Sequence, residues 1–286
     1  MTVVTVKQAI EKYEKYVRVT RSKGTHKYLK GKVGILLRYL GNMKCTEIDR
    51  EMLLDFIIKQ RDRNPDISNR TLNKYVLTLK QALKYACDID IHFDKMPEQK
   101  KIIETIPESM ITTIFNYYEN NQSNIILQRN YIMFRLLNET GLRITELLNL
   151  KISDFDFNSY SIHVKKTKTN VERYVFYGEK TNLLINRYIM SAKLTNHLFI
   201  DFVTGDIIKD YTLESICQRL RDKLSLNQSI SPHKWRHTFA TRFVQKNGNL
   251  EVLRQILGHT SISTTQKYLH INKDALRDEY VRVSKI

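Results

Sequence analysis

Three separated segments of the sequence carry arginine, histidine and tyrosine side chains of the kinds that act on phosphate esters. The segments are ETGLRITELLNL at 139–150, SPHKWRHTFATRF at 231–243 and LGHTSISTTQKYLH at 257–270. The residues that stand out in them are Arg143, His233, Arg236, His259 and Tyr268. When a hydroxyl attacks a phosphodiester, negative charge gathers on the non-bridging oxygens, and a guanidinium can present paired N–H donors to them. Arg143 and Arg236 fit that role.

Tyr268 is the candidate nucleophile. A phenol has a pKa of about 10 and is mostly protonated at neutral pH, so its attack needs arginine electrostatics and a nearby proton acceptor. His233 and His259 are the candidate acceptors. The departing 5′ oxygen needs a proton, which a lysine on a polar turn can deliver as a general acid. Lys168 fits that need.

The start of one predicted helix presents two of these residues. Ser231 followed by Pro232 is typical of an N-cap and a first helical position. That start places His233 and Arg236 one turn apart, where a helix N-terminus also favours phosphate. His237 is adjacent in sequence but points elsewhere on the helix, so we interpret it as a buried hydrogen-bonding residue that supports the site.

Each residue also has an ordinary structural explanation. Arg143 could pair with Glu146, one turn along the same helix. His259 could cap a helix, and Tyr268 could belong to the core. Their occurrence together favours a catalytic site, because a core histidine or tyrosine has no reason to accompany two arginines in this way. Under this interpretation Glu146 positions Arg143.

Competing chemistries find little support in the sequence. It contains no GxxxxGK[ST] loop for ATP, no HExxH motif or paired Cys/His set for zinc, and no evident carboxylate cluster for two-metal cleavage. A serine nucleophile has no accompanying motif. We therefore predict no metal site and no cofactor.

The charge of the chain predicts a polyanionic partner. Lys and Arg number 47 against 30 Asp and Glu, a net charge of +17. Residues 1–104 carry 22 basic and 13 acidic side chains (22 − 13 = +9), which leaves 25 − 17 = +8 for residues 105–286. Because both halves are basic, two domains that hold one duplex fit better than a basic tail on a neutral enzyme.

Cysteine usage and the absence of targeting signals predict a cytoplasmic protein. Cys45, Cys87 and Cys217 are far apart and form no CxxC pair, which fits a reducing compartment. The N-terminal residues lack the pattern of a secretory signal, and no apolar run approaches the length of a membrane span.

The first part of the chain has the periodicity of a helical bundle. Helices are predicted at 5–19, from a cap at Thr25, from Thr46 to Arg61, and after a cap at Ser68. We assign residues 1–92 to a helical DNA-binding domain. The pattern fails in residues 93–106, where Pro97, Lys100 and Lys101, followed by Pro107, mark an exposed segment that we predict to be a linker.

Residues 107–286 are predicted to form a second domain. Its expected helices lie at 107–119, 124–139, 145–150, 179–191, 211–224, 232–246, 249–257 and 262–270. Two alternating segments, SIHVK at 161–165 and RYVFY at 173–177, predict a small β-hairpin. A final amphipathic segment, 271–286, includes Leu276, Tyr280, Val281 and Ile286.

The three segments resemble the tyrosine recombinase family, which includes phage-type integrases, transposon-borne recombinases and chromosome-dimer resolvases. GLRxxEL, HxxRHTFAT and LGHxSIxTTxxYxH appear in the family's order. The similarity is close over the catalytic half and looser over 1–95, where SNRTLNKYVLTLKQALKYA looks like the family's last core-binding helix.

The resemblance implies an active site and a mechanism. By it, Arg143, Lys168, His233, Arg236 and His259 surround the nucleophile Tyr268. The family forms a 3′-phosphotyrosyl link and frees a 5′ hydroxyl, with neither metal nor ATP. The lysine is the weakest transfer: alignment back from Glu172-Arg173 favours Lys168, but a register slip would bring Lys166 or Lys165 to the phosphate.

The resemblance also implies an architecture. We expect a mainly α protein with a small antiparallel β-sheet, in which a SAM-like core-binding domain and a mixed α/β catalytic domain form a C-shaped clamp on double-stranded DNA. Arg70, Asn73 and Lys74 are candidate DNA contacts, although a solvated charged face explains them nearly as well. A tetramer on two core sites is implied, with 271–286 buried against a neighbouring protomer; packing in cis is the alternative.

Two other functions would also explain these sequence features. A topoisomerase IB-like enzyme would use similar chemistry but only relax supercoils. A DNA-binding regulator with an idle active site would form no covalent complex. The motifs favour a site-specific recombinase of a mobile element or for replicon resolution, and they leave open which of these roles it has.

Overall fold

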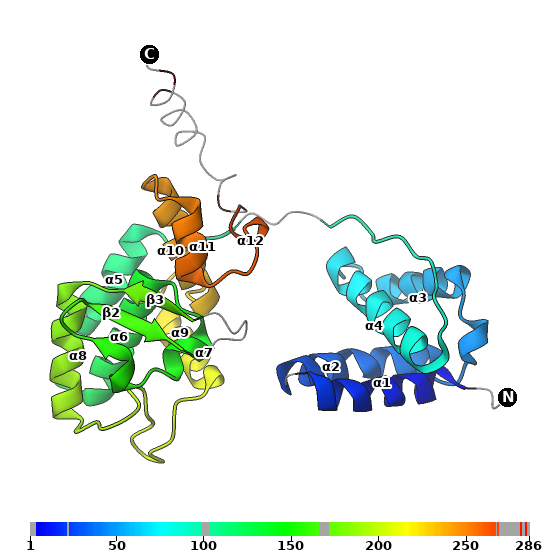
Figure 1. Ribbon diagram of the computed structural model, residues 1–286, viewed down its shortest axis with the longest axis horizontal. Coiled ribbons are helices and arrows are strands. Elements are labelled where there is room, and N and C mark those ends of the chain that lie inside the picture. The colour runs from blue at the N-terminus through cyan, green and yellow to red at the C-terminus, as the bar shows by residue number, and fades with distance from the viewer. Residues whose placement is uncertain are drawn as a thin grey trace. The chain divides into compact units, whose positions relative to one another are not determined.

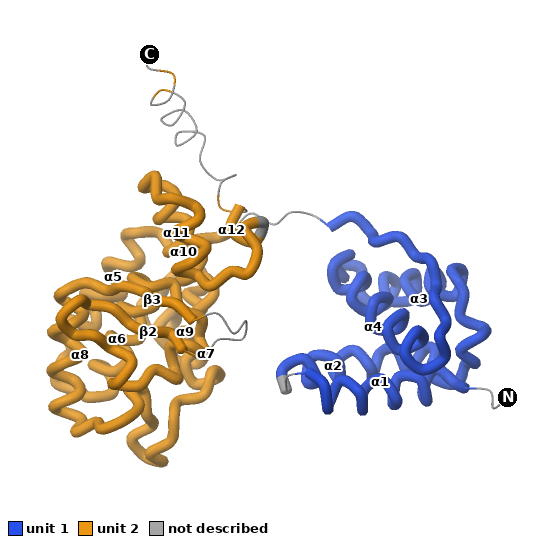
Figure 2. The backbone as a smooth tube through the Cα atoms, in the orientation of Figure 1, with its two compact units in different colours: residues 1–101 blue, residues 102–286 orange. Residues whose placement is uncertain are grey.

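The computed structural model describes residues 4–21, 23–98, 103–165, 172–266, 268, 281 and 284. Within it the chain forms two compact units, residues 1–101 and 102–286 (Figure 2). The division falls inside the segment 93–106, where the sequence predicted a linker. Each unit has its own hydrophobic core, and each is described separately below.

The described residues of unit 1 form four α-helices, each of which the sequence predicted (Figure 1). They are α1 (Val6–Thr20), α2 (Lys23–Leu40), α3 (Arg50–Arg63) and α4 (Asn69–Cys87), with a 3-10 turn η1 (Cys45–Glu47). Helix α1 packs against α2 and α4. Its first turn is held by a capping box, in which Thr5 Oγ1 accepts the Gln8 N–H and Gln8 Oε1 accepts the Thr5 N–H.

Two expected helix starts in unit 1 are wrong. Helix α2 begins at Lys23, so Thr25 lies inside the helix, whereas an N-cap must precede the first helical residue with a non-helical backbone. Helix α3 does not begin at Thr46, because η1 occupies that segment. It begins after Asp49, whose side chain accepts the Met52 N–H at 2.9 Å. The expected cap Ser68 is confirmed at α4, where it accepts the Thr71 N–H.

The end of unit 1 is tied to α4 by side-chain hydrogen bonds to the backbone. Asn73 receives the Met96 N–H on Oδ1 and donates from Nδ2 to the Met96 carbonyl, both at 2.9 Å. Asn69 Nδ2 donates to the Pro97 carbonyl at 2.7 Å. Residues 96–98 therefore run along α4 as an ordered segment, which we call the connector.

Unit 2 is mainly helical with one small sheet, as the sequence predicted. Its helices are α5 (Glu108–Glu119), α6 (Ile125–Thr140), α7 (Ile144–Leu148), α8 (Glu179–Ser191), α9 (Asp210–Lys223), α10 (Pro232–Gln245), α11 (Leu250–Leu257) and α12 (Ser263–Gln266), with a 3-10 turn η2 (Ile152–Asp154). Helix α6 lies in the centre and packs against α8 and α10 (Figure 1). Of the expected segment 271–286, Val281 and Ser284 lie within the described residues, and Val281 is exposed.

The sheet has three antiparallel strands where a two-stranded hairpin was expected. Strands β2 (Ser161–Val164) and β3 (Arg173–Phe176) pair with Ile162 opposite Val175, and β1 (Phe155–Asp156) adds to the other edge of β2. Strand β1 escaped prediction because two residues are too few to show an alternating pattern. Ile162 and Val175 are fully buried, so the sheet closes one side of the core.

A glycine ends the central helix next to the functional segment. Gly141 has φ 61°, and a Cβ at this position would lie 2.4 Å from the Phe239 ring. Only glycine combines this left-handed backbone with so close an approach. The chain leaves α6 at this turn and enters the short helix α7 through Arg143. No helix in the described ranges is long and apolar enough to cross a membrane.

Candidate active site

The site is organised around the C-terminal end of α11. This helix ends at Gly258, which has φ 62°, and the last carbonyls of a helix lack partners within it. Arginines bind the carbonyls at and just after this end: Arg173 of β3 binds that of Ile256, Arg236 of α10 that of Leu257, Arg143 before α7 that of Gly258, and Arg254 of α11 itself that of His259. The partial negative charge of a helix C-terminus favours these cations. Segments more than 100 residues apart thus meet at one helix end.

Arg236 is the most buried of the arginines that the motifs indicated. It projects from α10, is 6% exposed, and donates to the Gly141 carbonyl at 2.7 Å and to the Leu257 carbonyl at 2.6 Å. Burial, and then the neighbouring charge of Arg143, lower the pKa of Arg236 to about 9. The guanidinium stays charged at neutral pH but lacks full compensation, so an arriving anion is favoured.

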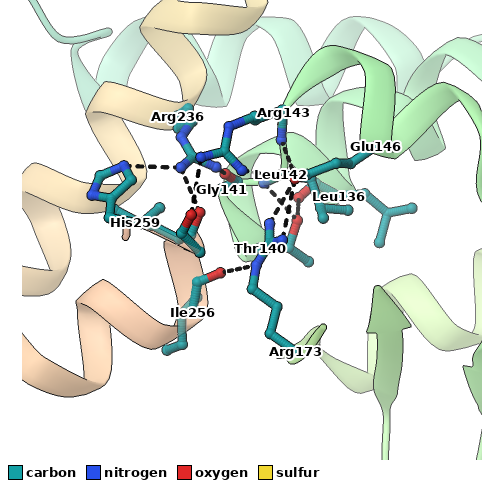
Figure 3. Close-up of polar contacts among 12 residues, drawn as sticks. Leu136, Thr140, Gly141, Leu142, Arg143, Glu146, Arg173, Arg236, Ile256 and His259 are labelled. Carbon is teal, nitrogen blue, oxygen red and sulfur yellow. Dashed lines mark hydrogen bonds and ion pairs between the residues drawn. The ribbon is translucent and has the colours of Figure 1, made fainter. Parts of the chain in front are cut away.

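Arg143 is held by a buried carboxylate. Glu146 accepts the Arg143 backbone N–H at 2.9 Å and its guanidinium at 2.8 Å, as expected for a residue that positions Arg143 (Figure 3). Burial raises the pKa of Glu146, but hydrogen bonds and charge from Arg173, with further bonds from Arg143, leave it below the usual value. Arg143 remains partly accessible, with 23% of its side chain exposed.

Arg173 is a residue of this cluster that sequence reasoning missed. From the start of β3 it forms a bidentate pair with Glu146 at 3.1 and 2.6 Å, and its Nε donates to the Ile256 carbonyl at 2.6 Å (Figure 3). The signal was in the strand: Arg173 shares the inward face of β3 with Val175, and a charged residue at an inward position needs a buried partner.

His259 has both ring nitrogens engaged. Nε2 lies 3.0 Å from Arg236 Nη2 and Nδ1 lies 2.8 Å from Thr265 Oγ1. A guanidinium can only donate, so Nε2 is the acceptor and Nδ1–H of the neutral ring donates to Thr265. The Nε2 lone pair of His259 therefore accepts a hydrogen bond from Arg236 and orients its guanidinium. The same lone pair would be needed if His259 were to take the proton of Tyr268.

Tyr268 lies inside the unit with its hydroxyl on a histidine. The side chain is 1% exposed and packs with apolar residues of α10 and α11, which are Ala240, Val244, Leu253 and Leu257. Its hydroxyl is 2.8 Å from Nδ1 of His237. Burial raises the pKa of Tyr268 to about 12, against the opposing charge of Arg236. The phenol is therefore protonated at neutral pH.

The other residues indicated by the motifs are placed as follows. Ser231 caps α10 and Pro232 is its first residue, as expected, and His233 is exposed on that first turn, unlike the buried Arg236. Lys168 and Lys166 lie outside the described residues. Lys165 is described, and its Nζ donates to Asp154 at 3.1 Å.

Two of the three candidate DNA contacts on α4 bind the connector instead. Asn73 uses its amide on the backbone of Met96, and Arg70 Nε donates to Glu98 at 2.9 Å. Lys74 is exposed, with Nζ 5.4 Å from the centre of the Tyr28 ring. Among the described residues, no group of three or more His, Cys, Asp or Glu side chains is arranged to hold a metal ion.

Comparisons with known proteins identify the family of the chain. Residues 104–275 match the model of the phage integrase family. The chain is 28% identical over 249 residues to a probable integrase/recombinase of Acholeplasma phage L2. The aligned residues cover 85% of this chain and 84% of the relative. It is 24% identical over 299 residues to the tyrosine recombinase XerC of Oceanobacillus iheyensis, covering 96% and 94% of the two chains.

Solved structures share the fold. The Tn1549 transposon integrase in complex with transposon right end DNA superposes with a TM-score of 0.81 at 22% identity, covering 98% of this chain and all of that one. The XerH site-specific recombinase bound to palindromic difH substrate gives 0.72 at 21% identity, covering 97% and 84%. The chain therefore belongs to the phage integrase family and is a tyrosine recombinase.

Proposed function

We propose that this recombinase cuts DNA by attack of the Tyr268 hydroxyl on a phosphodiester. A bond forms between Tyr268 Oη and phosphorus, the bond from phosphorus to the 5′ oxygen breaks, and a 3′-phosphotyrosyl link and a 5′ hydroxyl remain. The observation that carries the proposal is the convergence of Arg143, Arg236 and His259 on the end of α11, directly before the segment that holds Tyr268.

The two arginines are proposed to bind the non-bridging oxygens of the scissile phosphate. Arg236 is fixed in place by two carbonyls and His259, and Arg143 by Glu146. Donors held in this way need little reorganisation as negative charge develops, and this is the main source of electrostatic catalysis. Because the phosphotyrosyl link keeps the energy of the phosphodiester, rejoining needs no ATP, and the two guanidiniums supply the charge stabilisation that a metal ion would otherwise give.

The departing 5′ oxygen must gain a proton. Lys168, which lies between β2 and β3 in the sequence, is the proposed general acid, with Lys166 as the alternative. Lys165 is the weaker choice, because its ammonium is engaged with Asp154. Rejoining reverses the steps: the 5′ hydroxyl of an incoming strand attacks the phosphotyrosine and releases Tyr268.

The proposed substrate is double-stranded DNA with specific core sites. The net charge of +17, spread over both units, supports contact with many phosphates, so binding should weaken steeply with salt. Lys74 and Arg70 on α4 are proposed contacts in unit 1. We further propose a tetramer on two sites, with residues 271–286 packed against a neighbouring protomer.

A role in a mobile element or in replicon resolution is proposed from similarity. One relative is named as a probable integrase/recombinase of a phage, and one structural neighbour is a transposon integrase in complex with transposon right end DNA. Either role joins two sites by exchanging strands.

Covalent capture tests the proposed function. The purified protein is incubated with plasmids that carry the DNA flanking its gene, denatured with detergent, and the protein-linked DNA is sequenced to map the cleavage position. A duplex of that site, nicked just 3′ of the scissile phosphate, then traps the adduct because the short 5′-hydroxyl fragment diffuses away. The expected result is transfer of a 5′-end label to the protein.

Tyr268→Phe should bind the same duplex and form no adduct, because it lacks the attacking oxygen. Tyr188, which lies on α8, is also fully buried. Tyr188→Phe is therefore the matched control and should form the covalent adduct normally. Trapping by Tyr268→Phe would show that another residue is the nucleophile. Absence of any adduct with the parent protein would favour an idle regulator, and relaxation of supercoils without exchange between two sites would favour a topoisomerase.

A further inference from the structure

His237 touches the atom that the proposed function makes the nucleophile. Its Nδ1 is 2.8 Å from the Tyr268 hydroxyl oxygen, and the two rings lie 5.9 Å apart between centroids. The two residues come from different motif segments, His237 from α10 and Tyr268 from the segment after α12. A contact between a histidine and a nucleophilic hydroxyl is the arrangement by which proteins activate hydroxyl groups.

The histidines first considered as proton acceptors are less suited to the task. His259 Nε2 receives a hydrogen bond from Arg236, and its Nδ1 contacts Thr265, so its lone pair is already engaged. His233 is exposed on the first turn of α10, whereas Tyr268 is buried. His237 combines contact with the hydroxyl and a half-buried position, which gives the proton a route from the buried phenol toward solvent.

We propose that His237 is the catalytic residue that accepts the proton of Tyr268 during strand cleavage. This inference rests on the proposed phosphotyrosyl chemistry. The Oη–H proton passes to His237 Nδ1, the Oη lone pair forms the bond to phosphorus, and the bond from phosphorus to the 5′ oxygen breaks. The 5′ oxygen takes its proton from the ammonium of the hairpin lysine. During rejoining, the imidazolium returns its proton to Tyr268 Oη.

The position of His237 suits this role. Arg236, the preceding residue, carries the phosphate-binding guanidinium, so α10 presents the proton acceptor and an anion-binding group from adjacent positions. The helix is anchored at both neighbouring turns: Ser231 caps its start, and Thr238 Oγ1 accepts the Ile106 N–H at 2.8 Å. A base held on a rigid element keeps its geometry through the reaction.

The test is the rate of covalent trapping by His237→Asn on the nicked duplex of the mapped site. Asparagine places a hydrogen-bonding oxygen or nitrogen near the position of Nδ1 but cannot take up a proton. Loss of a general base lowers a rate by about 10²- to 10⁴-fold, and we expect a fall in that range with unchanged affinity for the uncut duplex. His197→Asn, at another half-buried histidine of unit 2, is the matched control and should trap at the parent rate.

A second measurement separates proton transfer from a purely structural role. Tyr268 is replaced by 3,5-difluorotyrosine, whose phenol loses its proton more readily, in both the parent and the His237→Asn background. Because a more acidic nucleophile depends less on a base, the rate ratio between the two backgrounds should shrink by about tenfold or more. An unchanged ratio, or trapping by His237→Asn at the parent rate, would overturn the proposal.

Folding and the proposed function are controlled independently. Thermal unfolding of His237→Asn should resemble that of the parent protein. If it does not, His237→Ala supplemented with free imidazole replaces it, and the added base should restore trapping; failure to restore it in a folded variant counts against the proposal. A parent protein that forms no adduct would reject the proposed function itself, whereas an adduct that forms equally well without His237 rejects only this inference.

Discussion

Two regions of the molecule bind backbone carbonyls through side chains, and they differ in burial and charge. At the end of α11, guanidiniums bind four consecutive carbonyls, and Arg173, Arg236 and Glu146 are almost fully buried. At the connector of unit 1, amides of α4 bind Met96 and Pro97 at half-buried or exposed positions.

This difference in burial and charge indicates on which contacts the stability of the fold depends. A carbonyl or carboxylate that loses its partner at an exposed position is solvated by water. One that loses its partner in the interior keeps the full desolvation cost, especially if it is charged. Substitution of the buried residues at the α11 end should therefore cost stability, whereas the connector should tolerate substitution. Three substitutions test this contrast, from the largest expected effect to the smallest.

Arg173→Met should cause the largest loss of stability. It leaves Glu146 buried with Arg143 as its remaining cation and frees the Ile256 carbonyl. Removal of one partner from a buried pair costs about 3–5 kcal/mol, and we expect a decrease of that size in the free energy of unfolding measured with denaturant at pH 7.

The pH dependence of this loss identifies its cause. The pKa of Glu146 is lowered in the folded protein, so its ionised form stabilises the fold above about pH 4.3, the pKa of an unfolded glutamate. That stabilisation is lost as the pH falls through the folded pKa. Without Arg173 the folded pKa rises, so the difference between variant and parent should be largest near neutral pH and shrink in acid. A difference that stays constant with pH would assign the loss to packing instead.

Arg236→Lys should reduce both stability and cleavage. Lysine keeps the charge but cannot bind the Gly141 carbonyl, the Leu257 carbonyl and a phosphate together. We expect a decrease of about 2–3 kcal/mol in the free energy of unfolding and a fall of about 10²- to 10³-fold in the trapping rate. Arg187→Lys, at an exposed position of α8, is the control and should change neither quantity. A stable but inactive Arg236→Lys would show that the carbonyl contacts matter less than the comparison implies.

Asn73→Ala should have the smallest effect. It removes the hydrogen bonds to the backbone of Met96, but water can replace them, so we expect a loss of about 1 kcal/mol in the unfolding of unit 1. Faster hydrogen exchange at the Met96 amide, with trapping on the nicked duplex unchanged, would localise that effect. A loss as large as that of Arg173→Met would remove the contrast between the two regions.

Local signals in the sequence predicted much of the fold. Ser68 and Ser231 each stand before an amphipathic run, and helices α4 and α10 begin directly after them. Thr25 misled for the same reason, because capping residues also occur inside helices. Strand β1 is too short for a pattern to register, and its place in the sheet depends on pairing with β2.

The sequence indicated the family of the chain and predicted which residue types could carry its chemistry. Arg143, Arg236, His259 and Tyr268 stand in motifs whose side-chain types and order are readable without coordinates, because their chemistry is a property of single residues. The contacts that these side chains make depend on other residues, which the motifs do not specify.

Only the tertiary structure shows which groups far apart in the sequence share a hydrogen bond. Packing of α10, α11 and β3 brings Arg173 to Glu146 and the Ile256 carbonyl, and it places His237 on the Tyr268 hydroxyl while His259 turns to Arg236. Spacing along the chain cannot specify such contacts, because they join residues 23 to 83 positions apart and depend on the burial of side chains around them.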